Sequence, residues 1–324
     1  MVQSPVSAAP EAIAAQTDVR VWVNGQIVDA EGARLPHLTH SFHYGLGAFE
    51  GIRAYEVAPG VGAVFRLDDH IRRLIASCHL VTLDKALTFS HADLTQACVA
   101  TLQANRLSEG YLRPVIYLGA GAMGIGATSN PVHALVAGWK WGAYLGDEGL
   151  RRGIACCISS FQRPGHATTL TKGKLTGQYI NSILAKREAV GNGYDEAILL
   201  NEQGYITEAT GENVFMVKDN QLITPPLGMN ILAGITRATM IEMACDRGII
   251  VVERPFARDE LYCADEVFLT GTAAEVTPVR AVDGRNIGQG QRGPMTELLQ
   301  QGYFDIVRGR DSRYARWLTR FDLP

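Results

Sequence analysis

The sequence predicts an α+β fold in two domains. At 324 residues with 47% hydrophobic residues, the chain is long enough to form two cores of ordinary size. Strand and helix patterns mix throughout, without the regular strand–helix–strand alternation of a doubly wound parallel sheet. We place a flexible arm at residues 1–18, a smaller domain at 19–147 and a larger domain at 148–324. The interdomain loop falls at about 141–151.

Turn and cap signals define the elements of the smaller domain. Asn24-Gly25 is a strong hairpin signal between strands at 21–23 and 26–28. Ser90 with Asp93 forms a capping signature that opens a helix reaching Asn105. The segment 37–56 is rich in His, Tyr, Phe and Gly, which favours a site lining over a plain strand. The remaining elements are strands at 64–66, 111–118 and 132–138, a helix at 67–77 and a glycine-rich loop at 119–130.

Similar signals define the larger domain. Asp219-Asn220 separates the strands of a second hairpin, 213–218 and 221–224. Gly191 and Gly248 are suitable stop residues for helices that begin near residues 179 and 235, because glycine readily adopts the left-handed conformation that ends a helix. A last long helix covers 295–304. The other strands are expected at 154–159, 195–200, 205–207, 249–253, 266–270 and 276–282.

Composition excludes several classes of function. The net charge of −3 gives no reason to expect nucleic acid or an anionic membrane as a partner. The sequence contains no run of eighteen apolar residues, so it predicts no membrane-spanning helix. Its first residues lack the basic start of a secretory signal. Six scattered cysteines form no C-x-x-C pair, and no histidine cluster has zinc spacing. We therefore expect a cytoplasmic protein with reduced, mostly buried thiols and no metal.

A lysine in a short turn is the first candidate for chemistry. The stretch TKGKLTGQY places Lys174 in a short turn rich in glycine and threonine, just before a patterned helix. A lysine there is often only solvated, since the helix dipole disfavours a positive charge at a helix start. Lys172, two residues earlier, is the rival nucleophile.

Three further segments favour a catalytic lysine over a merely solvated one. Glu208 lies in YITEATGENVF beside small residues that would not crowd a ligand. The segment LAGITR, with Gly234, Ile235 and Thr236, opens a helix whose exposed N–H groups would bind an anion. The turn LTGTAAE, with Gly271, offers further N–H groups. An amine, a carboxylate and two anion sites match the aldehyde, the ring nitrogen and the phosphate of pyridoxal 5'-phosphate (PLP).

Seven motifs in order resemble the branched-chain amino acid aminotransferases, which are class IV, fold type IV PLP enzymes. The resemblance covers roughly residues 20–304. It implies a smaller α/β N-terminal domain and a larger C-terminal domain with a pseudo-barrel. The motifs are HYGLGAFEGIR, YLRP, WGAYLG, GKLTGQYINS, GYITEATGENVF, LAGITR and LTGTAAEVTPVR.

The resemblance implies a role for each cofactor-binding residue. Lys174 matches the lysine that forms the Schiff base and moves the substrate proton, and Glu208 matches the residue facing the pyridine nitrogen. Tyr179 corresponds to the tyrosine that bonds the ring oxygen, and Leu232 to the residue packed on the ring. The residues that match the phosphate-binding positions are Arg73, Gly234, Ile235, Thr236, Gly271 and Thr272.

The resemblance also implies the substrates, which are L-leucine, L-isoleucine or L-valine in one half reaction and 2-oxoglutarate in the other. Arg113 would hold the distal carboxylate of glutamate, and Tyr111 with the Thr272-Ala273 turn would bind the α-carboxylate. Ile125 matches a residue that closes the pocket of a neighbouring subunit, which implies a homodimer as the minimal active unit. The apolar box would consist of Tyr44, Phe49, Trp141, Tyr144 and Tyr179.

Two other hypotheses remain open. The first is an enzyme of the same fold with other chemistry: a D-amino acid or (R)-amine transaminase, or an aminodeoxychorismate lyase. YLRP together with WGAYLG disfavours it. The second is a relative without activity that binds a metabolite or partner, which the intact lysine, glutamate and arginine set disfavours.

Overall fold

The computed structural model describes residues 19–142 and 145–324. The predicted N-terminal arm and Tyr144 therefore lie outside the described residues. The described chain divides into two compact units. The N-terminal unit contains residues 19–141, 173–178 and 305–324, and the barrel unit contains 142, 145–172 and 179–304. The N-terminal unit thus takes up the Lys174 turn and the C-terminal residues, which the predicted limits assign to the larger domain.

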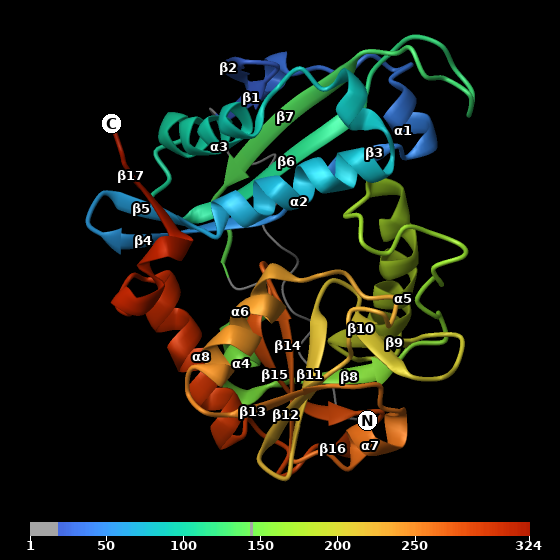
Figure 1. Ribbon diagram of the computed structural model, residues 1–324, viewed down its shortest axis with the longest axis vertical. Coiled ribbons are helices and arrows are strands. Elements are labelled where there is room, and N and C mark those ends of the chain that lie inside the picture. Colours follow the sequence, from blue (N-terminus) through green and yellow to red (C-terminus); the bar gives the residue numbers. More distant parts are fainter. Residues whose placement is uncertain (1–18, 143–144) are drawn as a thin grey trace. The chain divides into compact units, whose positions relative to one another are not determined.

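An eight-stranded sheet forms the framework of the N-terminal unit (Figure 1). Its order is β17-β5-β4-β6-β7-β1-β2, and β3 also pairs with β6. The predicted hairpin at Asn24-Gly25 joins the first two strands, and Asn24 has the positive φ of 47° that such a turn requires. The strands are β1 (Arg20–Val23), β2 (Gln26–Asp29), β3 (Gly47–Phe49), β4 (Ile52–Ala58), β5 (Val61–Phe65), β6 (Gly110–Leu118), β7 (Val132–Trp139) and β17 (Leu318–Asp322).

Helices α2 (Leu67–Leu80) and α3 (His91–Ala104) pack on this sheet through one hydrophobic core. Ile71 and Leu94 from the helices and Ile52 from the sheet are at most 1% exposed. The predicted capping signature is confirmed, because Ser90 and Asp93 exchange both hydrogen bonds of a capping box. A short helix, α1 (His40–Tyr44), precedes β3.

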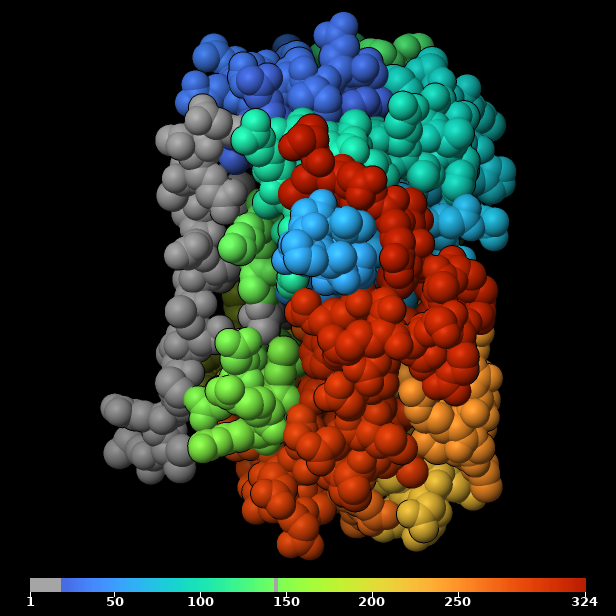
Figure 2. Space-filling view, turned by 90° about the vertical axis from the view of Figure 1, so that its left-hand side faces the viewer, coloured from blue at the N-terminus to red at the C-terminus, as the bar shows by residue number. Residues whose placement is uncertain are grey.

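The C-terminal residues complete the same sheet. Strand β17 pairs antiparallel with β5 along its whole length, from Leu318 opposite Phe65 to Asp322 opposite Val61. Figure 2 shows this red segment beside the light-blue turn between β4 and β5. The pairing explains why residues 305–324 group with the N-terminal unit.

A second sheet closes into a barrel in the barrel unit. The ring runs β10-β9-β8-β15-β14-β11 and returns to β10, while β12, β13 and β16 extend it. Buried side chains such as Ile198, Val214 and Leu269 form its hydrophobic core. The strands are β8 (Ile154–Ile158), β9 (Glu196–Leu200), β10 (Ile206–Ala209), β11 (Asn213–Lys218), β12 (Gln221–Thr224), β13 (Ile250–Glu253), β14 (Glu266–Gly271), β15 (Glu275–Val282) and β16 (Arg285–Asn286).

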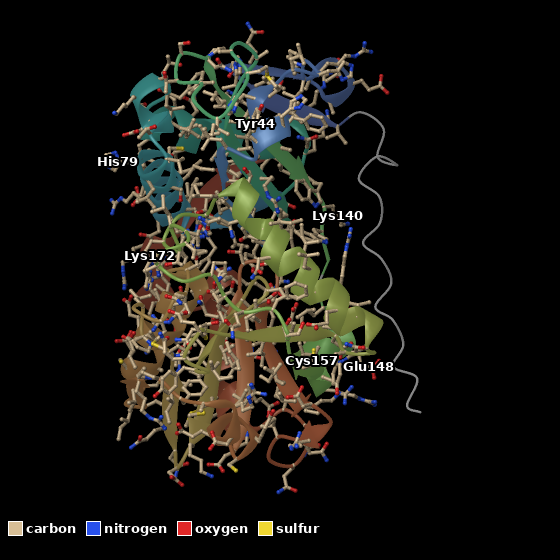
Figure 3. All side chains as sticks on the ribbon, turned by 90° about the vertical axis from the view of Figure 1, so that its right-hand side faces the viewer. Tyr44, His79, Lys140, Glu148, Cys157 and Lys172 are labelled. Carbon is tan, nitrogen blue, oxygen red and sulfur yellow. The ribbon has the colours of Figure 1, made fainter. Side chains whose placement is uncertain are left out.

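Helices surround this barrel. The buried face of α5 (Tyr179–Gly191) consists of small residues that pack over β8 and β9, where Cys157 is labelled in Figure 3. The apolar residues that recur along α5, Ile183, Leu184 and Val190, are instead exposed. The other helices are α4 (Gly146–Arg152), α6 (Ile235–Cys245), α7 (Arg258–Tyr262) and α8 (Pro294–Val307), whose last turn belongs to the N-terminal unit.

The α+β fold class with a barrel-like domain is confirmed. The segment 37–56, expected as a site lining more than a plain strand, contains α1, β3 and most of β4. Four cysteines are buried and none is paired in a disulfide within the described chain. None of the helices that the structure describes is long and apolar enough to cross a membrane. The described residues also form no cluster suited to hold a metal ion.

Candidate active site

The main chain of Lys174 is fixed on both sides within the N-terminal unit. Its N–H donates to Ser77 Oγ of α2 over 3.0 Å, and its carbonyl accepts from the Phe49 N–H of β3 over 3.0 Å. Ser77 in turn donates to the Arg73 carbonyl over 2.8 Å. The Lys174 Nζ lies 4.9 Å from the centroid of the Phe49 ring. The turn that carries the candidate lysine is thus held between a strand and the buried face of a helix.

Arg73 forms an ion pair that sequence analysis did not predict. Its Nε and Nη2 donate to the two carboxylate oxygens of Glu50 over 2.6 and 2.9 Å. His70 Nδ1 lies 2.7 Å from the same carboxylate, and both Glu50 and His70 are at most 1% exposed. Burial favours the neutral form of Glu50, but the charge of Arg73 and the contact with His70 outweigh it and hold the Glu50 pKa far below its ordinary value. Burial lowers the pKa of His70 despite the nearby Glu50 carboxylate.

Arg113 lies among aromatic rings. The guanidinium carbon is 4.8 Å from the Phe49 centroid, 5.5 Å from that of Tyr111 and 6.0 Å from that of Trp139. Arg113 Nη2 donates to the Tyr111 hydroxyl over 3.2 Å, and the Trp141 ring packs edge-on against Tyr111. Arg113 Nε is buried without a hydrogen-bond partner, and the described residues provide no carboxylate that pairs with this arginine. A half-buried cation without a counter-ion is suited to bind an anionic ligand.

Close packing in this group requires a glycine beside Tyr111. A Cβ at Gly51 would lie 1.9 Å from the Tyr111 hydroxyl oxygen. Gly51 therefore gives the Tyr111 side chain its position next to Arg113. The predicted substrate residues Phe49, Tyr111, Arg113 and Trp141 are thus brought together within one unit, and Trp139 joins them.

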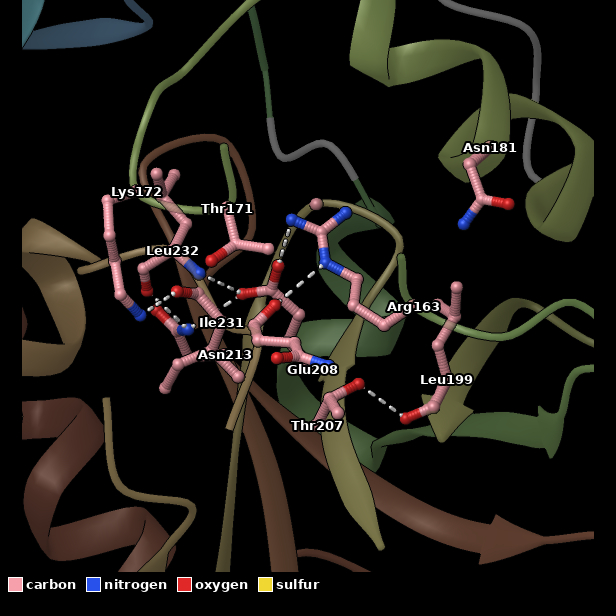
Figure 4. A network of polar contacts seen from close by, with 12 residues as sticks. Arg163, Thr171, Lys172, Asn181, Leu199, Thr207, Glu208, Asn213, Ile231 and Leu232 are labelled. Atoms are coloured by element: carbon pink, nitrogen blue, oxygen red, sulfur yellow. Dashed lines mark hydrogen bonds and ion pairs between the residues drawn. The ribbon is translucent and has the colours of Figure 1, made fainter. Parts of the chain in front are cut away.

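In the barrel unit, Glu208 is the centre of a polar network (Figure 4). The 6% exposed carboxylate pairs with Arg163 Nη2 at 2.6 Å and accepts from Asn213 Nδ2 and the Leu232 N–H over 3.1 and 3.0 Å. Asn213 also donates to the Leu232 carbonyl over 3.1 Å, and it lies directly opposite Glu208 in the β10–β11 pair. These contacts fix the carboxylate as a buried anion.

Lys172 belongs to the barrel unit and its amine has a structural task there. The Nζ donates to the carbonyls of Leu227 and Ile231, the latter over 2.9 Å. Burial, with smaller contributions from nearby arginines, lowers the pKa of Lys172. The Lys172 amine thus holds the 227–231 loop.

The predicted anion sites lie at a helix start and a hairpin turn of the barrel unit. Gly234 is the N-cap of α6, and the first turn of this helix contains neither an acidic residue nor a side-chain cap. The N–H groups of Ile235 and Thr236 therefore lie at an uncapped positive helix end. In the other segment, Gly271 ends β14, Thr272 and Ala273 belong to the turn before β15, and the buried Thr270 Oγ1 has no hydrogen-bond partner.

Each unit carries donors of types that a phosphorylated pyridine aldehyde needs. Lys174 provides an amine, and Glu208 provides a buried anion for a ring N–H. Arg73 in the N-terminal unit and the α6 N-terminus in the barrel unit are each of a kind that binds phosphate readily. Tyr179 is the first residue of α5 and is half-buried.

The other two substrate residues lie on the surface of the N-terminal unit. Ile125 is 95% exposed near the middle of the glycine-rich loop, and Tyr44, labelled in Figure 3, is 46% exposed at the end of α1. His40 Nε2 contacts the Gly124 carbonyl at 2.9 Å, which ties this loop to α1.

Sequence reasoning missed the partners of the candidate residues. Glu50, His70, Ser77, Arg163 and Asn213 each contact a predicted site residue directly or through one partner, yet none was singled out. Glu50 and Asn213 lie within motifs that carry the resemblance. No sequence signal identifies Arg163 as the partner of Glu208, because the two are 45 positions apart in sequence.

Comparison with known proteins places the chain in a family. Residues 47–282, well over half of the chain, match the family described as amino-transferase class IV. The chain therefore belongs to the class IV aminotransferases.

The relatives narrow this class. The branched-chain-amino-acid aminotransferase of Pseudomonas aeruginosa is 44% identical over 305 residues, covering 94% of this chain and 98% of that protein. The crystal structure of the Escherichia coli branched-chain amino acid aminotransferase matches with a TM-score of 0.89 and 41% identity, covering 92% and 98% of the two chains. The T.th. enzyme of the same name, solved with pyridoxamine 5'-phosphate, matches with a TM-score of 0.88 and 43% identity, covering 93% and 97%. Within its class, the chain is a member of the branched-chain aminotransferase family, which confirms the resemblance seen in the sequence.

Proposed function

We propose that the chain transfers the α-amino group of L-leucine, L-isoleucine or L-valine to 2-oxoglutarate, using PLP in a ping-pong reaction. The products are branched-chain 2-oxo acids and L-glutamate. The observation that carries the proposal is Arg113, a half-buried cation next to apolar rings, with no carboxylate partner among the described residues. Such a pocket suits both an apolar side chain and one that ends in a carboxylate.

The fixed polar groups support PLP as the cofactor. When bound, PLP provides a protonated ring that accepts the electron pair left as the substrate Cα–H bond breaks. Glu208, held anionic by Arg163 and Asn213, keeps the ring nitrogen protonated. Tyr179 donates to the ring oxygen, and Leu232 packs on the ring. Arg73, Thr272 and the helix start at Gly234–Thr236 would hold the phosphate, and Gly271 would allow its close approach.

Lys174 has two tasks in this proposal. Its Nζ holds the cofactor covalently between reactions. The same Nζ would act as the base and acid that moves the proton between the substrate Cα and C4′ of the cofactor. The two main-chain hydrogen bonds to Ser77 and Phe49 keep the base in place through both half reactions. Because the first product leaves before the second substrate binds, one pocket serves both substrates in turn.

The substrate pocket combines an apolar wall with one charge. Phe49 and Trp141 contact the branched side chain of leucine, isoleucine or valine. Arg113 binds the distal carboxylate of glutamate, while the Tyr111 hydroxyl and the Thr272-Ala273 turn bind the α-carboxylate. The complex of the T.th. enzyme with N-(5'-phosphopyridoxyl)-L-glutamate, at 40% identity and a TM-score of 0.86, supports a shared cofactor and glutamate pocket in this family.

A homodimer is the proposed minimal active unit. Ile125 projects almost fully exposed from a loop near Phe42, Leu38 and Tyr44, which are also exposed. In the barrel unit, Ile180, Ile183, Leu184 and Val190 form an exposed apolar stripe along α5. Apolar surfaces of this kind mark protein interfaces. In the dimer, Ile125 closes the pocket of the neighbouring subunit, and Tyr44 belongs to the apolar box.

A substrate panel tests the proposal. Initial rates are measured with 2-oxoglutarate and L-leucine, D-alanine or (R)-1-phenylethylamine. We expect the highest rate with L-leucine, and no rate with L-leucine would reject the proposed function.

Lys174→Ala is expected to lose both transamination and the visible absorbance of bound cofactor, whereas Lys172→Ala retains both. A yellow, active Lys174→Ala variant would show that another amine binds the cofactor covalently.

A further inference from the structure

The Glu50 carboxylate stands out as a buried charge that the proposed reaction does not use. It follows β3 directly, and its own N–H donates to the Pro114 carbonyl of β6 over 2.9 Å. The side chain is fully buried, and four donors converge on its two oxygens: Arg73 Nε, Arg73 Nη2, His70 Nδ1 and the main-chain N–H of Gly51. A buried carboxylate is retained only with strong partners, because leaving water costs several kcal/mol per ion.

The contacts fix one edge of the Arg73 guanidinium. Glu50 binds the Nε–Nη2 edge in a two-pronged arrangement, which defines the plane of the group and the direction in which its other edge points. His70 comes from the preceding turn of α2, and its lowered pKa makes it a neutral donor through Nδ1 at pH 7. Without the two hydrogen bonds to Glu50, Arg73 would have the rotamer freedom of a long side chain.

The same helix also holds the main chain of Lys174. His70, Arg73 and Ser77 lie on one side of α2, at spacings of three and four residues. Ser77 joins the Arg73 carbonyl to the Lys174 N–H, so that one buried helix face sets both the arginine and the lysine turn.

We propose that Glu50, supported by His70, is a positioning residue that orients the guanidinium of Arg73 for the phosphate of the cofactor. The inference rests on the proposed function, which assigns Arg73 to that phosphate. For the removal of Glu50, this inference predicts a change in phosphate affinity that is opposite to the change expected from charge repulsion alone. A carboxylate near an anion site repels the anion, so removal of its charge alone would tighten phosphate binding. If Glu50 acts by orienting Arg73, its removal weakens phosphate binding instead.

Equilibrium titrations of the cofactor-free, full-length protein separate the two effects. The probes are PLP and pyridoxal, which differ only in the phosphate. Glu50→Asp keeps the charge but shortens the side chain, and Glu50→Gln keeps the length but removes the charge. We expect both variants to raise the Kd for PLP at least tenfold while the Kd for pyridoxal stays within twofold. The inference is overturned if Glu50→Asp binds PLP like the wild type, if Glu50→Gln binds it more tightly, or if both probes lose affinity equally.

A double-mutant cycle with Arg73→Lys tests whether Glu50 acts through Arg73. In the Arg73→Lys background, Glu50→Gln is expected to change the Kd for PLP less than threefold, because the two-pronged partner is already lost. If the changes in the Kd for PLP caused by Glu50→Gln and Arg73→Lys were additive, the inference would be contradicted. If Arg73→Lys itself leaves the ratio of PLP to pyridoxal affinity unchanged, Arg73 does not bind the phosphate, and that part of the proposed function fails together with the inference.

His70 provides a second test if the Glu50 variants do not fold. Asparagine can place an amide donor close to the position of Nδ1, whereas leucine cannot donate. We expect His70→Asn to keep the selectivity for PLP over pyridoxal and His70→Leu to lower it severalfold. Equal selectivity in both variants would show that the donor to Glu50 has no part in positioning Arg73.

Discussion

Arg163 Nη2 lies 2.6 Å from Glu208 Oε1, and both side chains are at least 87% buried. A carboxylate in this setting stays ionised because a fixed cation compensates for the lost hydration. The ion pair therefore determines whether Glu208 can act as the anion that the proposed chemistry requires at the cofactor ring.

Arg163→Met is expected to lower turnover with L-leucine strongly at neutral pH. Breaking a buried pair by removing one partner typically costs about 3–5 kcal/mol, and a buried carboxylate that loses its cation shifts towards its protonated form. Single-turnover rates at pH 7 and pH 9 test this, and the ratio of variant to wild-type rate should rise with pH. Arg163→Lys, which keeps the charge, is the matched control. A rate ratio independent of pH would contradict this account.

Arg113→Ala is expected to impair the glutamate half reaction more than the leucine half reaction. Only glutamate places a charge beside Arg113, and a hydrogen bond to a charged group contributes about 1.5–3 kcal/mol, which corresponds to roughly a 10- to 150-fold difference in rate. Cofactor absorbance followed in each half reaction gives the two rate constants separately. Arg113→Lys should lose less, because it keeps the charge without the two-pronged geometry. Equal losses for both substrates would exclude Arg113 from distal carboxylate binding.

Gly234→Ala is expected to disturb the Glu208 network. An added Cβ would lie 1.9 Å from Asn213 Oδ1, so Asn213 must move and its bonds to Glu208 and the Leu232 carbonyl are lost. We expect weaker cofactor binding and a lower midpoint of thermal unfolding. Gly228→Ala is the control in the same loop, because nothing lies within 4 Å of its added Cβ. The explanation fails if both alanine variants behave alike.

Glu212 makes stability depend on pH. Burial, followed by repulsion from Glu196, raises the Glu212 pKa from 4.5 to about 8, while Lys186 opposes and Glu208 adds to the shift. Between pH 4.5 and 8 the carboxyl is ionised in the unfolded chain but protonated in the fold. The unfolded state binds fewer protons there, so the contribution of Glu212 to stability is complete below pH 4.5 and falls as pH rises towards 8.

Glu212→Gln should remove this dependence. The free energy of unfolding of wild type relative to the variant is expected to fall by at most about 1.4 kcal/mol per pH unit across that window. Urea unfolding at pH 5, 6.5 and 8 measures the difference. A difference that does not change with pH would mean that Glu212 is ionised in the folded protein.

Local signals in the sequence were sufficient for many elements. The hairpins at Asn24-Gly25 and Asp219-Asn220 form with positive φ at the turn residues, and the Ser90–Asp93 capping box starts α3. These structures depend on the backbone preferences of two to four neighbouring residues, which the sequence contains directly. The periodicity of α5 predicted its helix but not its buried side, because Ser182, Ala185 and Ala189 allow close packing on the barrel while the larger apolar residues face outward.

The sequence by itself therefore determined the α+β class, most element positions, the family and the candidate residues Lys174, Glu208, Arg73 and Arg113. Only the tertiary structure decided how those residues are held. Strand β17 joins β5 across more than 250 positions, Glu50 clamps Arg73, and Arg163 pairs with Glu208. Such contacts depend on the distance between groups after the chain has folded and on the loss of water around them. Neither quantity is a property of neighbouring residues in the sequence.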